Sequence, residues 1–281
     1  MKTSQNRIQN TFKGLKQKNE AAMIPFITAG DPFTDLTEEL AVAMAENGAD
    51  ILELGMPFSD PLADGPVIQA ASLRGLEAGM NTHNYLKLVQ NIRRQSQIPL
   101  VFMGYYNMVY QYGLKAFAED AVSAGLDGAI IPDLPIEEAD EWIAVARRAG
   151  LDTIFLAAPT TPMERIERIA QRSRGFLYYV SVTGITGARQ ELPAELAQNL
   201  AMARNHARLP VAVGFGISRP QQVAMLSQVA DGVIVGSAIV RLIEDGIRQG
   251  VPATALVQRI AGFVRELKQA TRYGIKPGQG A

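Results

Sequence analysis

The stretch LELGMPFSDPLADGPVIQ, residues 52–69, places a carboxylate where a buried strand is expected. Glu53 stands inside a short apolar run that breaks at Gly55. A charged side chain in a buried strand costs on the order of several kcal/mol unless it is partnered or neutralised. The loop that follows adds two more carboxylates, Asp60 and Asp64. We therefore expect the functional site in this stretch.

Outward from this stretch, a short apolar run followed by a segment of helical periodicity recurs along the chain. The apolar runs are residues 24–29, 51–56, 100–105, 129–131, 153–158, 176–182, 211–215 and 232–235. The helical segments are residues 37–47, 82–95, 113–124, 136–149, 162–173, 193–205, 220–229, 238–245 and 253–271. Eight strands joined by helices, with no long linker, indicate a (β/α)8 TIM barrel. An open doubly wound sheet gives the same local signals and is the alternative, but the count of eight favours the barrel.

The barrel prediction covers the whole chain, residues 1–281, as one domain with an extra N-terminal helix. That helix is expected at residues 4–18, where Ile8, Phe12 and Leu15 share one face. The strand runs are nearly continuous in apolar residues, which is typical of parallel strands covered on both faces.

The composition argues against several classes of partner. Of the 281 residues, 47% are hydrophobic and 20% charged, and the net charge of −1 comes with no basic run of the kind that binds nucleic acid. The first twenty residues lack the apolar core of a signal peptide, and no apolar run reaches the about 18 residues that a membrane span needs. We expect a cytoplasmic protein with no nucleic-acid or membrane partner.

In a barrel the active site lies where strands end and the following loops begin. The later strand ends are rich in glycine and run into helix starts, at Gly187, at residues 214–218 and at residues 235–238 with Ser237. Free backbone N–H groups at a helix N-terminus bind anions. We predict a phosphate site there; ordinary tight turns are the alternative.

The residues at the strand ends also argue against several reaction types that depend on lysine, metal ions or dinucleotides. None of the eight lysines falls in a strand run, which speaks against a Schiff base. There is no cysteine, and the two histidines, His83 and His206, lie in or next to helical segments and away from strand ends, so a zinc site has no plausible ligands. Magnesium held by Asp60 and Asp64 is a weaker alternative, and no dinucleotide fingerprint follows the first strand.

Carboxylates and tyrosines remain, the latter including Tyr105 after the third strand and either Tyr178 or Tyr179 in the sixth. Burial should raise the pKa of Glu53 toward the range useful for moving a proton near neutral pH. Asp64, in a loop rich in glycine and proline, could stay ionised and accept a hydrogen bond from a substrate N–H. Two carboxylates in different surroundings can take different roles. The alternatives are a structural ion pair for Glu53 and a solvated acid or helix cap for Asp64.

The loop at residues 183–193 has glycines in its first half, Arg189 at its centre and a closing proline. We interpret it as a lid over a bound phosphate, with a plain flexible loop as the alternative.

The chain resembles the family of tryptophan synthase alpha subunits over essentially its whole length. The resemblance is carried by PFITAGDP (25–32), the stretch at 52–69, GYYN (104–107), PDLP (132–135), YYVSVTGITGAR (178–189), GFGIS (214–218) and VGSAIV (235–240). It implies a TIM barrel that cleaves indole-3-glycerol phosphate into indole and glyceraldehyde 3-phosphate.

The resemblance also implies roles for individual residues. Glu53 matches the general acid/base, which protonates the indole ring, and Asp64 matches the carboxylate that binds the indole N–H. Among the substrate-binding residues, Tyr178 matches the active-site tyrosine, with Tyr179 facing away, and Thr186 a lid threonine. The remaining matches are phosphate contacts and the pocket wall, namely Gly187, Gly216, Gly236, Ser237, Phe215 and Ile234.

A partner follows from the same resemblance: a beta subunit that carries pyridoxal phosphate and receives indole, in an α2β2 heterotetramer. No cofactor is expected in this chain. The family's inter-subunit loop corresponds to Pro57, Phe58 and Asp60.

The chemistry of the residues agrees with this reading. Retro-aldol cleavage normally uses a Schiff-base lysine or a metal as electron sink, and the strand ends offer neither. A protonated indole ring can serve instead. Two alternatives stay open: another phosphate-binding lyase or isomerase, such as the synthase of the same substrate, whose strand-end lysine is missing here, and a non-catalytic regulatory subunit.

Overall fold

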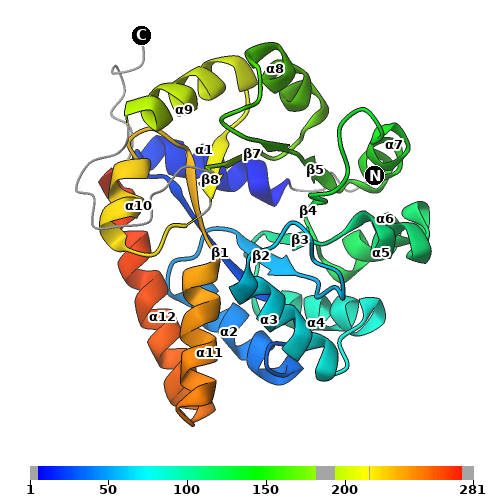
Figure 1. Ribbon diagram of the computed structural model, residues 1–281, viewed down its shortest axis with the longest axis vertical. Coiled ribbons are helices and arrows are strands. Elements are labelled where there is room, and N and C mark those ends of the chain that lie inside the picture. Colours follow the sequence, from blue (N-terminus) through cyan, green and yellow to red (C-terminus); the bar gives the residue numbers. More distant parts are fainter. Residues whose placement is uncertain (1–5, 182–193, 215, 274–281) are drawn as a thin grey trace.

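The computed structural model describes residues 6–181, 194–214 and 216–273. Parallel strands form a nearly closed barrel with helices around it (Figure 1). No helix within these ranges is long and apolar enough to cross a membrane. The predicted lid at residues 183–193 lies outside the described part, and with it Thr186 and Gly187. Phe215, residues 1–5 and residues 274–281 also lie outside it.

The strands follow the predicted order. They are β1 (Ala22–Thr28), β2 (Leu52–Gly55), β3 (Leu100–Met103), β4 (Gly128–Ile130), β5 (Asp152–Ile154), β6 (Leu156–Ala157), β7 (Leu177–Val180), β8 (Val211–Gly214) and β9 (Gly232–Val235). Their hydrogen-bonded order is β5-β4-β3-β2-β1-β9-β8-β7-β6. The fifth predicted strand is therefore split at Phe155: its first part pairs with β4 and its second with β7. Because one residue joins the two ends of the sheet, the arrangement is a barrel and not an open sheet.

Helices follow the strands around the ring. They are α1 (Arg7–Lys18), α2 (Thr34–Glu46), α3 (Pro66–Glu77), α4 (Thr82–Gln95), α5 (Tyr106–Tyr112), α6 (Leu114–Ala124), α7 (Asp140–Ala149), α8 (Met163–Arg172), α9 (Ala194–Ala207), α10 (Pro220–Leu226), α11 (Ser237–Arg248) and α12 (Ala253–Ala270), followed by the 3-10 turn η1 (Thr271–Tyr273). The sequence analysis missed α3 and α5. α5 has only 7 residues, too few to show a helical apolar period, and α3 buries the small residues Ala71, Ser72 and Gly75, which give only a weak one.

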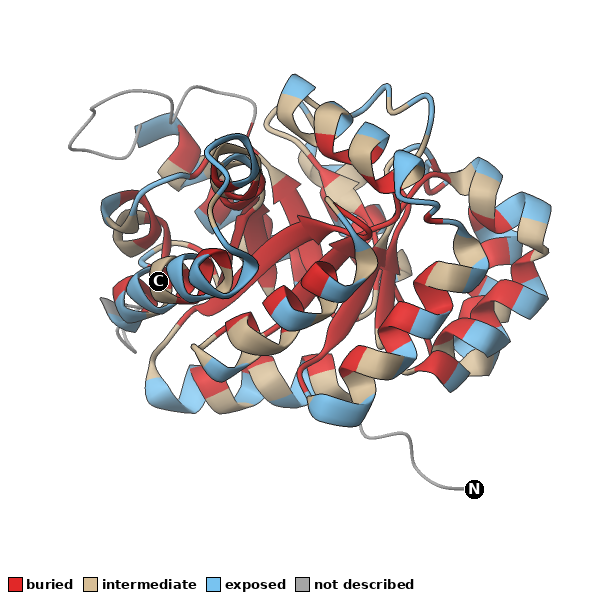
Figure 2. Cartoon of the chain, turned by 90° about the horizontal axis from the view of Figure 1, so that it is seen from below, coloured by how far each residue is buried: buried red, intermediate tan, exposed pale blue. Residues whose placement is uncertain are grey.

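The buried hydrophobic residues form an inner and an outer layer. Figure 2 shows that the strands are buried almost throughout and that the surrounding helices alternate between buried and exposed residues. The outer layer lies between the strands and the helices. The inner layer fills the barrel with residues such as Ile24, Val101 and Ile234, and its members from α1 are Ile8, Phe12 and Leu15. The N-terminal helix thus packs into the barrel interior, as its apolar face predicted.

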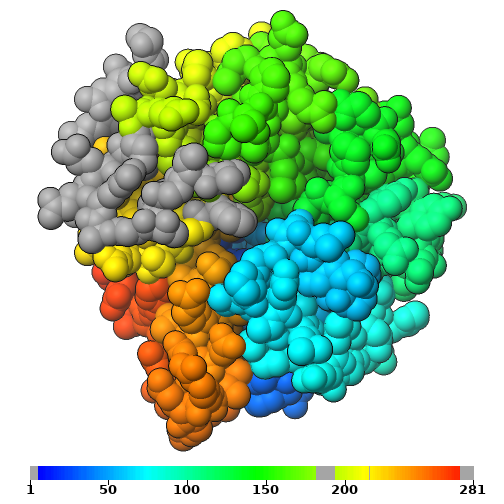
Figure 3. Space-filling view, viewed as in Figure 1, coloured from blue at the N-terminus to red at the C-terminus, as the bar shows by residue number. Residues whose placement is uncertain are grey.

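Polar contacts hold α1 against the barrel. The Asn6 amide donates to both carboxylate oxygens of Asp152, at 3.3 and 3.1 Å, and the Arg7 guanidinium pairs with Asp127 at 2.8 Å. Asp152 begins β5 and Asp127 precedes β4, so both acids lie at the N-terminal ends of strands. With that end covered by α1, the opposite end is left for a site. On that face α3, which follows the loop after β2, lies beside α11 (Figure 3).

Candidate active site

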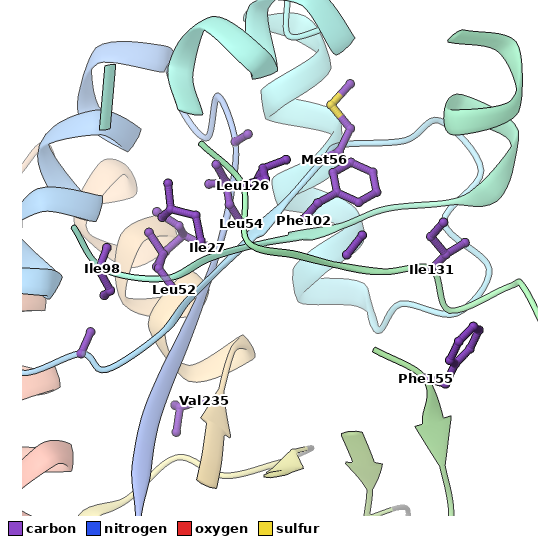
Figure 4. Packing of buried hydrophobic residues seen from close by; sticks show 14 of the residues in the cluster. Ile27, Leu52, Leu54, Met56, Ile98, Phe102, Leu126, Ile131, Phe155 and Val235 are labelled. Carbon is purple, nitrogen blue, oxygen red and sulfur yellow. The ribbon is translucent and has the colours of Figure 1, made fainter. Parts of the chain in front are cut away.

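Glu53 lies in the barrel interior. Along β2, Leu52 and Leu54 belong to the outer apolar layer (Figure 4), so the residue between them points inward. Its neighbours in register are Phe26 on β1 and Val101 on β3. Glu53 is 1% exposed, and its Oε2 has no hydrogen-bond partner among the described residues. No positively charged group in that part of the chain lowers the pKa of Glu53, so the described residues give it no structural ion pair.

This burial changes the acidity of Glu53. Loss of solvation raises the pKa of its carboxyl to about 8, and the negative charge of nearby Asp64 acts in the same direction. A carboxyl group with such a pKa is largely protonated at neutral pH and can give up that proton without a large free-energy cost. The side chain is therefore suited to general acid catalysis.

Asp64 lies in the loop between β2 and α3 and is less buried than Glu53. Its Oδ2 accepts a hydrogen bond of 3.0 Å from the Tyr105 hydroxyl, which itself accepts one of 2.9 Å from the Ala63 N–H. Burial raises the pKa of Asp64, and the hydrogen bond from Tyr105 opposes that rise. The Gln69 amide also donates to the Asp64 carbonyl at 2.9 Å. Both the side chain and the backbone of Asp64 are thus held in place.

The sequence analysis named Tyr105 among the tyrosines at strand ends but gave it no role in the site. It precedes α5, 41 residues away from Asp64, and the only signal in the sequence was its position after the third strand. The Tyr105 hydroxyl contacts the Asp64 carboxylate because the loop after β2 folds over the end of β3.

Tyr178 packs within the inner layer, whereas Tyr179 belongs to the outer one, in agreement with the orientation expected from the resemblance. A Cβ on Gly214 would lie 2.6 Å from the Tyr178 hydroxyl, so the glycine makes room for the ring. Burial raises the pKa of Tyr178 well above its usual range, and the charges of Glu53 and Asp64 add to this. Tyr178 is therefore a neutral hydrogen-bond donor close to both carboxylates.

Four more predicted residues lie in β9 or directly after β8 and β9. Gly216 has a φ of +72°, which favours glycine, and Gly236 directly precedes α11, whose first residue is Ser237. The first turn of α11 contains no acidic residue. Ile234 belongs to the inner layer. The N-terminus of this 12-residue helix can accept an anion through its N–H groups and the Ser237 hydroxyl.

A small pocket opens between the ends of β1, β2 and β3 and the start of α3. The residues around it are Phe26, Thr28, Gly55, Met56, Asp64, Ile68, Ser72, Met103, Gly104, Tyr105 and Pro132. Its wall is mostly apolar, with the Asp64 carboxylate at one side. Such a lining suits a flat aromatic ring that carries one hydrogen-bond donor.

The proposed partner loop shows three degrees of exposure. Asp60 is exposed, and Phe58 is half-buried with its ring stacked on Tyr105 at 5.0 Å between centroids. Pro57 is buried, and a Cβ on Gly75 of α3 would come within 3.2 Å of it. Leu62, which the sequence did not single out, is 93% exposed. Surface available to a partner is thus offered by Asp60 and Leu62 more than by Pro57.

Within the described ranges, no group of three or more histidine, cysteine, aspartate or glutamate side chains is arranged to bind a metal ion.

Comparison with known proteins gives one consistent result. The family model of the tryptophan synthase alpha chain matches residues 12–272. The tryptophan synthase alpha chain of Geotalea uraniireducens (strain Rf4) is 49% identical over 95% of this chain and 98% of its own length. That of Geobacter sulfurreducens is 50% identical over 94% of this chain and 98% of its own.

Solved structures agree. The tryptophan synthase subunit alpha of Legionella pneumophila str. Paris superimposes with a TM-score of 0.88 at 39% identity, covering 95% of this chain and 99% of that one. A Mycobacterium tuberculosis tryptophan synthase chain gives 0.86 at 35% identity, with the same coverage.

The raised pKa of Glu53 predicts a pH-dependent stability. Since the carboxyl has a higher pKa in the folded chain than its usual 4.5, the folded chain binds more protons between about pH 4.5 and 8. The free energy of unfolding that depends on Glu53 must fall as the pH rises through that interval. Glu53→Gln removes this loss, so the variant should be more stable than the wild type at pH 8.5 and closer to it at pH 5.

Urea unfolding at the two pH values measures the effect, with Asp60→Asn, a change at an exposed carboxylate, as control. A stability difference between Glu53→Gln and the wild type that stays constant with pH would contradict the prediction.

Proposed function

The chain belongs to the tryptophan synthase alpha chain family, and we propose that Glu53 and Asp64 together perform the reaction of that family at the pocket described above. It is the alpha subunit of tryptophan synthase, a lyase that cleaves indole-3-glycerol phosphate into indole and glyceraldehyde 3-phosphate. The observation that supports the residue roles best is the buried carboxyl of Glu53 beside Asp64, whose Oε2 has no hydrogen-bond partner within the described ranges.

Glu53 starts the cleavage as an acid. It gives its proton to the ring carbon that bears the glycerol chain, which turns the indole ring into a cationic iminium. The bond between that carbon and the chain then breaks, and its electron pair neutralises the ring. The chain hydroxyl next to the broken bond loses its proton, which returns to Glu53, and becomes the aldehyde. Since the ring takes up the electrons, no lysine or metal is required.

Asp64 and Tyr105 act at the opposite side of the ring. The carboxylate accepts a hydrogen bond from the ring N–H and stabilises the positive charge that develops there. Tyr105 already donates to Asp64 at 3.0 Å and so acts as a positioning residue. Preorganised charge of this kind is an effective way to stabilise a transition state.

The phosphate is bound at the start of α11. The proposed contacts in the described part of the chain are Gly216, Gly236 and Ser237, and Tyr178 and Ile234 line the barrel interior beside them. Thr186, Gly187 and Phe215 complete the substrate-binding set, and the lid at residues 183–193 would close over it. The whole chain acts as one barrel domain.

The alpha subunit works with a beta subunit in an α2β2 heterotetramer, and pyridoxal phosphate is the cofactor of that beta subunit, not of this chain. Phe58, Asp60 and the neighbouring Leu62 form the proposed contact with it, while Pro57 shapes the loop from beneath. The cytoplasm is the proposed site of action. A non-catalytic regulatory subunit is not favoured, because the chain has the pair Glu53 and Asp64.

Glu53→Gln tests the acid directly. The amide keeps the shape of the side chain but cannot supply the proton, so the rate of indole release from indole-3-glycerol phosphate should fall by about 10²–10⁴-fold. The variant should still bind the substrate. Indole release at the wild-type rate would exclude Glu53 as the acid.

Tyr105→Phe tests the positioning of Asp64. Loss of a hydrogen bond to a charged group should lower kcat/KM by about 10- to 100-fold. Tyr112→Phe is a matched control, because the Tyr112 hydroxyl donates to Asp120 at 2.7 Å on the surface. The prediction fails if the two variants behave alike in the indole-release assay.

The proposed partner contact predicts a separate defect. The double variant Asp60→Ala, Leu62→Ser should weaken binding to the beta subunit by about 10-fold or more, while indole release by the isolated alpha subunit stays near the wild-type rate. Titration of activity with beta subunit measures this. Ile247→Ser, which also removes an exposed apolar side chain but at the far end of α11, should bind like the wild type. Equal affinity of all three proteins would argue against this contact surface.

A further inference from the structure

Thr28, the last residue of β1, has a buried hydroxyl that none of the described residues hydrogen-bonds. The residue is 2% exposed, and its Oγ1 has no hydrogen-bond partner among the described residues. Burying a hydroxyl without a partner is unfavourable, because its hydrogen bonds to water are lost and not replaced. A ligand that restores the bond would account for its presence.

The side chain faces the same space as the candidate site. Along β1, Ile24 belongs to the inner layer, whereas Met23 and Ile27 belong to the outer layer. By the alternation of a strand, Thr28 points inward with Phe26. It is one of the residues around the pocket that contains Asp64.

The position of β1 in the ring indicates which part of a substrate is near. β1 pairs with β2, which carries Glu53, on one side and with β9, which leads into Gly236 and Ser237, on the other. A substrate with its ring at the carboxylates and its phosphate at α11 must cross the end of β1 with the chain that joins them. Thr28 is at that crossing.

From these observations we propose that the Thr28 hydroxyl forms a hydrogen bond with one of the two hydroxyl groups of the substrate's glycerol chain. The inference rests on the proposed function. The other polar groups of the substrate have partners of better matching chemistry: a carboxylate for the ring N–H, and N–H groups and Ser237 for the phosphate. A threonine hydroxyl donates and accepts at once, and so does an alcohol.

The test compares three variants. Thr28→Val replaces the hydroxyl by a methyl group of similar size, and Thr28→Ser keeps the hydroxyl. Thr153→Val is the matched control: Thr153 is also buried, but its hydroxyl donates to the Arg172 carbonyl at 3.3 Å, on β5. Each protein is assayed for the KM of indole-3-glycerol phosphate, for inhibition by 3-(indol-3-yl)propyl phosphate, which lacks both chain hydroxyls, and for Tm.

Thr28→Val should raise the KM by about 3- to 10-fold, the effect of one neutral hydrogen bond, and leave the inhibition constant of the propyl analogue unchanged. Its Tm should hold or rise, because an unpartnered hydroxyl is removed. Thr28→Ser should keep most of the affinity. Thr153→Val should show the reverse pattern, with a lower Tm and an unchanged KM.

The proposal is overturned if Thr28→Val leaves KM unchanged, if it weakens the substrate and the propyl analogue equally, or if it lowers Tm as Thr153→Val does. Failure of the proposed function gives a different result, since the wild-type chain would then release no indole from indole-3-glycerol phosphate.

Discussion

Burial of the Glu53 carboxyl inside the barrel is the constraint to which the rest of the site is adapted. The carboxyl lies in the inner layer with no partner among the described residues, so its charged form is disfavoured and its pKa rises to about 8. The barrel tolerates this cost because its apolar layers are extensive and α1 packs into the interior at the opposite end. The proton that makes Glu53 an acid is thus a consequence of where the strand places it.

Tyr105 connects the chemistry to the surface. Its hydroxyl contacts Asp64, and its ring stacks on Phe58 in the loop proposed to meet the beta subunit. A displacement of Phe58 by a partner would therefore act on a side chain that also positions a proposed catalytic carboxylate. The proposed partner contact and the orientation of Asp64 thus share one aromatic residue.

An ion-pair network fixes the elements that surround the substrate. Arg74 on α3 binds the buried Asp31 through two nitrogens, at 2.6 and 2.9 Å, and reaches Glu244 on α11 at 3.4 Å. It thereby joins the loop after β1, the helix that follows Asp64 and the helix proposed to bind phosphate. Removal of one partner would leave Asp31 as an uncompensated buried charge, which is costly.

The (β/α)8 barrel could be predicted from eight apolar runs, each followed by a helical segment. Glu53 could be singled out in the same way, because a carboxylate inside an apolar run is evident from the residues alone. The absence of lysine from the strand runs restricted the chemistry in the same way. The side chains that surround Glu53 and Asp64 became known only from the tertiary structure. Tyr105 meets Asp64 across 41 residues, the Thr28 hydroxyl has no hydrogen-bond partner among the described residues, and Pro57 is buried under its loop. Hydrogen bonds and burial depend on side chains from segments far apart in the sequence, and a local pattern of residues carries no information about which distant segments meet.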